Sequence, residues 1–156
     1  MKRLSKEHIL FKKVGMYLIV TSFYLATIAF AKGSFGTTLF LGGVIGAVLL
    51  EIENPLSRIV EQPKDRPLFH NVFFQLVVLT MAFYTLLLSE SDFSFGLIMG
   101  LLLHLLLDNI NDYFDEERFL RWFWITRDGT SRFTQRIYFT VMLFLFLYFS
   151  VMFVTR

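Results

Sequence analysis

Long apolar blocks constrain this chain more than any other feature. The chain has 156 residues, of which 55% are hydrophobic and 20 are phenylalanine. Soluble domains contain ~45–50% apolar residues, which alternate with polar ones, whereas a helix that crosses a bilayer needs roughly 20 consecutive apolar residues. The apolar residues of this sequence gather in blocks that approach that length. The sequence therefore predicts an all-α, polytopic integral membrane protein.

We expect about five transmembrane helices in one domain that covers residues 1–156. The five apolar blocks are Val14–Ala31, Phe35–Leu50, Val72–Leu88, Phe95–Leu107 and Ile137–Val154. The second and fourth blocks are short for a full crossing, so each either extends into the flanking polar residues or ends where protein encloses it. No internal repeat or long linker divides the chain.

The distribution of basic residues predicts a cytoplasmic N-terminus. Every other loop is basic, and its basic residues are Lys2, Arg3, Lys6, Lys12 and Lys13, then Arg58, Lys64 and Arg66, then Arg118, Arg121, Arg127, Arg132 and Arg136. The two remaining loops contain Lys32 and the acidic segment Ser89–Asp92. Positive charge is retained on the cytoplasmic side of a membrane. This alternation is what five spans with a cytoplasmic N-terminus require.

A cleaved signal peptide is an alternative reading of the first apolar block. Ala29, Phe30 and Ala31 have the small-x-small form of a cleavage site. The apolar run before them is about 18 residues, longer than the ~7–15 residues of a typical signal-peptide core. The length favours a retained membrane span.

His104 and Asp108 end one of the most apolar stretches of the chain. Four residues apart on a helix, they share a face. Ionisable groups at membrane depth are costly, so they usually face a protein interior or a cavity. The pair is either a hydrogen-bonded helix end or the beginning of a metal site.

A layer of histidines and carboxylates is expected at the cytoplasmic ends of the spans. The second span ends in Glu51 and Glu53 just before Pro55, and proline disfavours helix at the residue that precedes it. If the backbone from Glu51 to Glu53 is extended, both carboxylates point to one side. The candidate metal ligands are His8, His70, His104, Asp108, Glu51 and Glu53. With no cysteine in the chain, this nitrogen and oxygen set suits a divalent ion, zinc first, with manganese, magnesium or iron as alternatives.

Small residues indicate how two of these spans approach each other. Two ladders of i, i+4 spacing end in ionisable residues: Gly96, Gly100, His104 and Asp108 on the fourth span, and Gly43, Ala47 and Glu51 on the second. Small residues let transmembrane helices pack closely. Such ladders can serve packing alone. If the two ladders meet, however, Glu51 lies beside His104 and Asp108.

The ordered set of motifs resembles the family of inner-membrane metal-dependent hydrolases, also described as LexA-binding, membrane-associated hydrolases. The segments that carry the resemblance are Glu7-His8, Leu49–Ser57, Arg66–Asn71, Gly100–Asp108 and Asp128–Thr130. Their order and spacing agree over nearly the whole chain. The chain departs from the family pattern in having Glu51 and Glu53 for two aspartates, Leu50 for a proline, Phe69 for a threonine and Asn71 for a serine, and in lacking a Thr-Pro after Asp108.

The resemblance implies a multi-pass enzyme of the inner (plasma) membrane that hydrolyses a phosphoester or lipid-like substrate. The family is similar to zinc-dependent phospholipases C and P1-type nucleases. His70, His104 and Asp108 are then the leading metal ligands, with Glu51 and Glu53 as ligands or as the general base. Arginines of the following loop are candidates for binding an anionic substrate, and they are Arg118, Arg121 and Arg127.

Two other functions stay open. A non-catalytic membrane scaffold or partner subunit could keep the fold with an inactive site, because the glutamates reshape it. A metal or proton carrier would need polar groups through the depth of the bilayer, and the outer halves of the spans offer only Thr21, Ser22, Thr37, Thr38 and Thr80. The expected surroundings are membrane lipids. No basic surface with interleaved aromatic residues indicates nucleic-acid binding.

Overall fold

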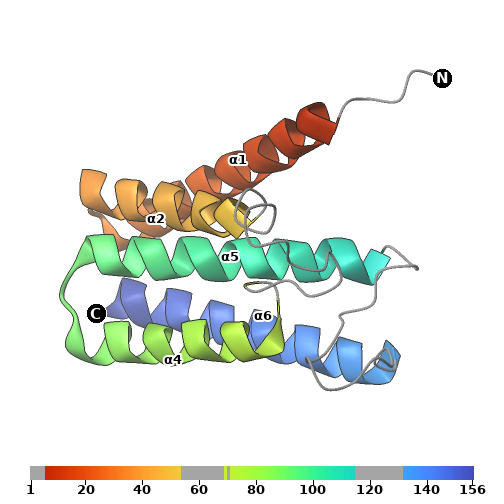
Figure 1. Ribbon diagram of the computed structural model, residues 1–156. Coiled ribbons are helices and arrows are strands. Elements are labelled where there is room, and N and C mark those ends of the chain that lie inside the picture. Colours follow the sequence, from red (N-terminus) through yellow and green to blue (C-terminus); the bar gives the residue numbers. More distant parts are fainter. Residues whose placement is uncertain (1–5, 54–68, 70, 115–131) are drawn as a thin grey trace.

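The structure is a computed structural model that describes residues 6–53, 69, 71–114 and 132–156 (Figure 1). This described part is helical and contains no strand. Its elements are α1 (Lys6–Lys32), α2 (Thr37–Leu49), the 3₁₀ turn η1 (Leu50–Ile52), α4 (Val72–Leu88), α5 (Asp92–Phe114) and α6 (Arg132–Thr155). The prediction of an all-α chain is confirmed for these residues, and each predicted apolar block forms a helix.

Three of these helices are long and apolar enough to cross a membrane: α1 over Lys12–Lys32, α5 over Asp92–Asn111 and α6 over Arg136–Thr155. The apolar helices α2 and α4 are shorter. At 1.5 Å per residue, the 13 residues of α2 span about 20 Å, less than the ~30 Å of a bilayer core. For the fourth span, the expected extension into the flanking polar residues is observed. Its helix, α5, covers Asp92–Phe114 in the described residues.

Helix α5 is the central element. It lies between α2 on one side and α4 and α6 on the other (Figure 1). In its candidate span 72% of the residues are buried, against 28% in the spans of α1 and α6. The outer helices therefore present most of their apolar side chains outward, as helices that face lipid do. Any polar site carried by α5 is enclosed by protein.

Glycines bring the backbones of α2 and α5 into direct contact. A Cβ added at Gly100 would overlap the carbonyl oxygen of Gly43, and a Cβ would also overlap facing backbone at three more glycines: Gly42, Gly46 and Gly96. Only glycine permits so close an approach of two helices. The prediction that the two small-residue ladders meet is confirmed.

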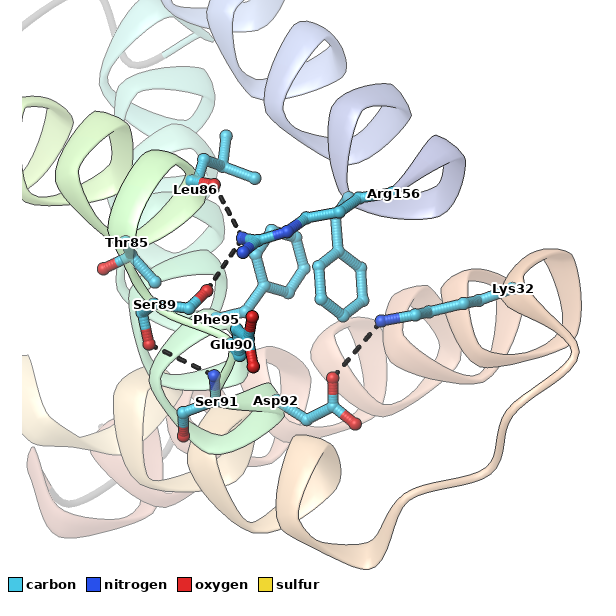
Figure 2. A pocket seen from close by; sticks show the side chains of 10 residues that line it. Lys32, Thr85, Leu86, Ser89, Glu90, Ser91, Asp92, Phe95 and Arg156 are labelled. Atoms are coloured by element: carbon cyan, nitrogen blue, oxygen red, sulfur yellow. Dashed lines mark hydrogen bonds and ion pairs between the residues drawn. The ribbon is translucent and has the colours of Figure 1, made fainter.

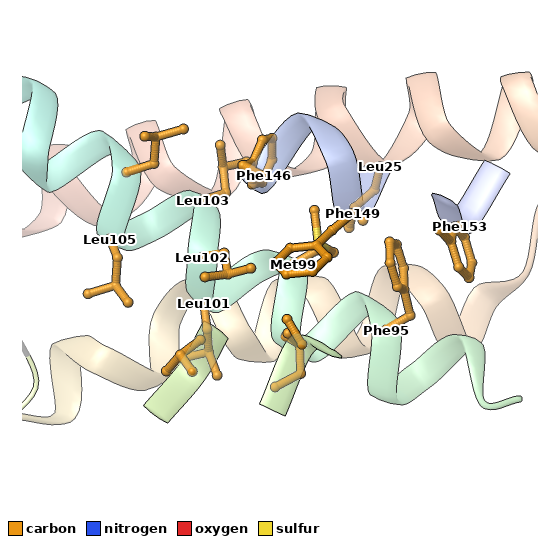
Figure 3. Packing of buried hydrophobic residues seen from close by; sticks show 14 of the residues in the cluster. Leu25, Phe95, Met99, Leu101, Leu102, Leu103, Leu105, Phe146, Phe149 and Phe153 are labelled. Carbon is orange, nitrogen blue, oxygen red and sulfur yellow. The ribbon is translucent and has the colours of Figure 1, made fainter. Parts of the chain in front are cut away.

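Aromatic and aliphatic side chains fill the other side of α5. Met99 of α5 belongs to one buried cluster with Leu25 of α1 and Phe149 of α6 (Figure 3). Farther along, Phe95 stacks on Phe153 with ring centroids 3.5 Å apart. This packing ties α1 and α6 to α5, and it fixes which face of each outer helix points inward.

Thr21 is a polar residue within this apolar packing, and substituting it tests whether its buried hydroxyl lowers the stability of the fold. The side chain is fully buried, and its hydroxyl has no hydrogen-bond partner in the part of the chain that the structure describes. A buried hydroxyl without a partner costs about 1–3 kcal/mol. We therefore expect Thr21→Val, which keeps the shape, to raise the free energy of unfolding by about 1 kcal/mol in detergent micelles.

The matched control is Thr27→Val on the same helix. Thr27 is exposed, and its hydroxyl donates to the carbonyl of Phe23. The control should change stability by less than about 0.5 kcal/mol. A lower unfolding midpoint for Thr21→Val than for the parent protein would show that the hydroxyl is satisfied.

Candidate functional site

Three ionisable residues meet where η1 continues from α2 beside α5. His104 Nε2 lies 3.3 Å from Asp108 Oδ2 and 3.9 Å from Glu51 Oε1. His104 is fully buried, and both carboxylates are nearly so. The prediction that Glu51 lies beside His104 and Asp108 is therefore confirmed.

The close contact of α2 and α5 explains this convergence. His104 stands one helical turn beyond Gly100, and Glu51 stands one turn beyond Ala47. Residues four apart share a helix face. Because no side chain separates the two backbones at Gly100, the next turns of both helices face each other at short range.

A backbone carbonyl fixes the ring of His104. Its Nδ1 lies 2.6 Å from the carbonyl oxygen of Ala47. A carbonyl oxygen only accepts hydrogen bonds, so Nδ1 carries a proton and donates it. Ala47 is in the last turn of α2, where carbonyls lack the regular partner four residues on. The interaction satisfies that carbonyl and directs Nε2 toward the two carboxylates.

The resulting arrangement directs a histidine nitrogen at two carboxyl groups. With Nδ1 protonated, a neutral imidazole has only a lone pair at Nε2. That lone pair would face Asp108 Oδ2 and Glu51 Oε1, which are also acceptors. A proton shared between Nε2 and a carboxyl group, a metal ion or another cation can each make this contact favourable.

Helix α1 contributes a cation and a hydroxyl that the sequence interpretation missed. Lys13 Nζ lies 2.9 Å from Asp108 Oδ1 and 3.7 Å from Glu51 Oε1. The hydroxyl of Tyr17 donates to Asp108 Oδ1, and the Tyr17 and His104 rings lie 4.0 Å apart. We call these five residues, Lys13, Tyr17, Glu51, His104 and Asp108, the His104 site.

The sequence interpretation uses Lys13 only as one of the basic residues that predict a cytoplasmic N-terminus. The sequence does contain an indication that Lys13 and Tyr17 act together, because they are four residues apart and share one face of α1. It was weak, since a lysine and a tyrosine near the end of a span are ordinary interfacial residues.

The residue types at the site suit a divalent metal ion, but their distances in this structure do not form a complete metal-binding site. Donor atoms bound to one zinc ion at ~2.0–2.2 Å lie roughly 3.3–3.6 Å apart in a tetrahedral site. The His104–Asp108 separation is 3.3 Å, and the His104–Glu51 separation of 3.9 Å is slightly too long. Among the described residues, no group of three such side chains is placed to hold an ion as it stands. A metal would require Glu51 to shift and Lys13 to move away.

Glu53 does not join Glu51, contrary to the expectation of an extended segment. The backbone continues as a helical turn, with φ −56° and ψ −37° at Glu53. Side chains two residues apart on a helix do not face the same way. Glu53 Oε2 instead accepts a hydrogen bond from the backbone N–H of Phe69, at 3.1 Å. Pro55 restricts Asn54, which lies outside the described residues, so it imposes no extended conformation on Glu51 to Glu53.

Several predicted site residues fall outside this comparison. His70, Arg118, Arg121 and Arg127 lie outside the described residues, and His8 lies in α1 but its side chain is not among those described. Their roles as ligands or in substrate binding stay predictions.

A buried amide cluster adjoins the site on the far side of α5. Gln75 of α4 and Asn109 of α5 exchange two hydrogen bonds, of 3.4 and 3.2 Å, and the hydroxyl of Tyr138 of α6 donates to Gln75 Oε1. Both amide side chains are almost completely buried. Since Asn109 follows Asp108, this cluster restrains the turn of α5 that carries the His104 site.

The other end of the helices has a second polar region, around a cavity of about 240 Å³ (Figure 2). Lys32 Nζ lies 3.3 Å from Asp92 Oδ1 and 3.9 Å from the centroid of the Phe153 ring. Arg156 donates to the carbonyls of Leu86 and Ser89 at 2.7 and 2.8 Å. Lys32 thus joins the end of α1 to the start of α5, and Arg156 joins the end of α6 to the end of α4.

Comparisons with protein-family models, curated proteins and solved structures find no match to this chain. The resemblance to the inner-membrane metal-dependent hydrolases therefore depends on the sequence motifs. What the protein does is inferred from the geometry of the His104 site.

Proposed function

We propose that this protein is a membrane hydrolase that depends on a divalent metal ion held by Glu51, His104 and Asp108, with zinc as the first candidate. The observation that carries the proposal is the hydrogen bond of His104 Nδ1 to the Ala47 carbonyl. Histidines that bind metals almost always donate their other ring N–H to a carbonyl or carboxylate. Here that bond leaves Nε2 directed at two buried carboxylates.

Each residue of the site has its own proposed role. A bound metal supplies a water of lowered pKa and polarises the scissile bond. Ala47 holds the His104 ring, and Tyr17 holds Asp108 through its hydroxyl. The close packing of α2 on α5 excludes bulk water from one side. Lys13 is partly exposed, so its ammonium is available for an anionic substrate.

The proposed substrate is a phosphoester, such as a lipid headgroup. The site lies near the ends of α1 and α2, which supports a position close to the lipid headgroups, and the family resemblance implies this substrate class. Arg118, Arg121 and Arg127 are proposed to bind its negative charge.

The proposed topology is five spans in the inner (plasma) membrane, with the site at the cytoplasmic face. The pairing of Lys13 with Asp108 supports this placement, because it puts the site at the N-terminal end of α1. That end carries the first cluster of basic residues, and such clusters stay in the cytoplasm.

A second candidate is a non-catalytic membrane scaffold in which the same residues form a permanent ion-pair network. The observation that favours it is the ammonium of Lys13, 2.9 Å from Asp108 Oδ1. This ammonium supplies the positive charge that the buried carboxylates need, so no metal is required. Transport is less well supported, because the described ionisable residues gather at the two ends of the helices.

Metal content separates the two candidates. In detergent, the parent protein reconstituted with zinc and washed should retain about one ion per chain by elemental mass spectrometry. His104→Ala should lower zinc affinity by more than the ~10–100-fold that is typical of losing an outer-shell partner, and Glu51→Gln should also lower it. Asp92→Asn, which alters a paired carboxylate at the other end, is the control and should bind zinc like the parent.

Zinc binding that follows this pattern, together with hydrolysis of a member of a phosphoester panel, would support the hydrolase. Stoichiometric zinc without hydrolysis of any panel member would support the metal centre and count against the hydrolase activity. A parent protein that retains no zinc, manganese or magnesium would eliminate the proposed metal centre.

A further inference from the structure

Lys13 contacts the same carboxylates that the proposed metal would need. Its Nζ lies 2.9 Å from Asp108 Oδ1 and 3.7 Å from Glu51 Oε1, the oxygen that is 3.9 Å from His104 Nε2. Two cations held by the same carboxylates repel each other strongly in a buried site, where the effective dielectric constant is far below that of water. A metal bound there must displace the ammonium of Lys13.

The side chain of Lys13 is suited to such a displacement. It is 38% exposed, whereas the side chains of Glu51 and Asp108 are 7% and 12% exposed. A lysine carries its charge on a flexible four-carbon chain, so it can turn toward solvent without moving α1. The two carboxylates are more buried, and Asp108 is also bound by the hydroxyl of Tyr17.

Lys13 also has a second contact close to the site. Its Nζ lies 5.2 Å from the centroid of the Tyr17 ring, within the distance at which an ammonium is attracted to an aromatic face. The ammonium is thereby directed back toward the carboxylates whenever no other cation holds them.

We propose that Lys13 is a tethered cation that competes with the divalent metal for Glu51 and Asp108, so that it keeps the carboxylates neutralised until a metal displaces it. This inference rests on the proposed metal centre and adds its regulation. It implies that the parent protein binds metal more weakly than the same ligands would without Lys13, because the contacts of Lys13 must break before the metal binds.

Lys13→Met tests the competition, because methionine is similar in length and carries no charge. Zinc titrated by calorimetry into chelator-stripped protein in detergent should bind this variant at least 10-fold more tightly than the parent. Without zinc, the variant should unfold at a lower temperature, and zinc should restore the midpoint. Lys12→Met is the matched control, since Lys12 is the exposed neighbour and its loss should change neither quantity.

A measurement on the parent protein avoids dependence on a variant that fails to fold. Amine-reactive labelling followed by peptide mass spectrometry should show Lys13 becoming several-fold more reactive when zinc is added. Lys12 and Lys32 should keep their reactivity.

The possible outcomes separate this inference from the proposed function. Equal zinc affinity of the parent and Lys13→Met, with unchanged labelling of Lys13, would overturn the competition and leave the metal centre in place. Tighter zinc binding by Lys13→Met than by the parent, together with increased labelling of Lys13 when zinc is added to the parent, would support the competition. Failure of the parent, Lys12→Met and Lys13→Met alike to bind zinc, manganese or magnesium would overturn both.

Discussion

Gly100→Leu is expected to separate α2 from α5 and to destroy the His104 site together with the local fold. A Cβ at this position already overlaps the carbonyl oxygen of Gly43 and approaches the backbone of Ala47. Overpacking a core typically costs 1–3 kcal/mol because side chains can rearrange. Here the obstacle is the backbone of a helix, which cannot rotate away. We therefore expect a loss of at least about 3 kcal/mol in the free energy of unfolding.

The measurement is the midpoint of unfolding when SDS is titrated into mixed micelles, with helix content monitored by circular dichroism. Gly15→Leu provides the control, because a Cβ at Gly15 has no neighbour within 4 Å. It replaces the same residue type within a helix and should be tolerated. If both variants unfold at the same midpoint, the close contact of α2 and α5 is not what holds this part of the fold together.

Asp108→Ala is the second substitution with a large expected effect. The carboxylate accepts from Tyr17, pairs with Lys13 and lies 3.3 Å from His104 Nε2. Removing one partner of a buried ion pair costs about 3–5 kcal/mol. We expect the lower end of that range, about 3 kcal/mol, because Lys13 can still pair with Glu51 or turn to solvent. The experiment uses chelator-treated protein, so that metal binding does not contribute.

Asp92→Ala is the matched control at the other end of α5. Asp92 is also an aspartate paired with a lysine, Lys32, but its side chain is 33% exposed, against 12% for Asp108. Exposed pairs contribute about 0–1 kcal/mol. Equal losses for Asp92→Ala and Asp108→Ala would show that water reaches both carboxylates similarly, and a dry metal site would then be excluded.

The location of the His104 site connects its stability to its proposed chemistry. The α2–α5 contact buries His104, the last turn of α2 orients its ring, and α1 closes the site with Lys13 and Tyr17. A site built at the junction of three helices responds to any movement of α1. Displacing Lys13 is a smaller change, since only its side chain has to turn and α1 stays in place.

The core of the site could be predicted from the sequence because its determinants are local. His104 and Asp108 share a face by their spacing, and the same periodicity puts Gly100 beneath them and Ala47 beneath Glu51. Ladders of small residues that end in ionisable groups then predict which helix faces meet. Glu53 could not be placed this way, because one backbone turn decides whether it points with Glu51 or away from it.

The sequence by itself determined where the apolar helices run and which residues share a face on each of them, so that Glu51 lies beside His104 and Asp108 once the two small-residue ladders meet. Runs of apolar residues and their periodicity are sufficient for those conclusions. The tertiary structure alone decided that Lys13 and Tyr17 complete the site. Apolar residues occur around the whole circumference of α1. One face can meet lipid and the other the protein interior, and these two surroundings are equally apolar. Only packing against α2, α5 and α6 selects the face of α1 that turns inward.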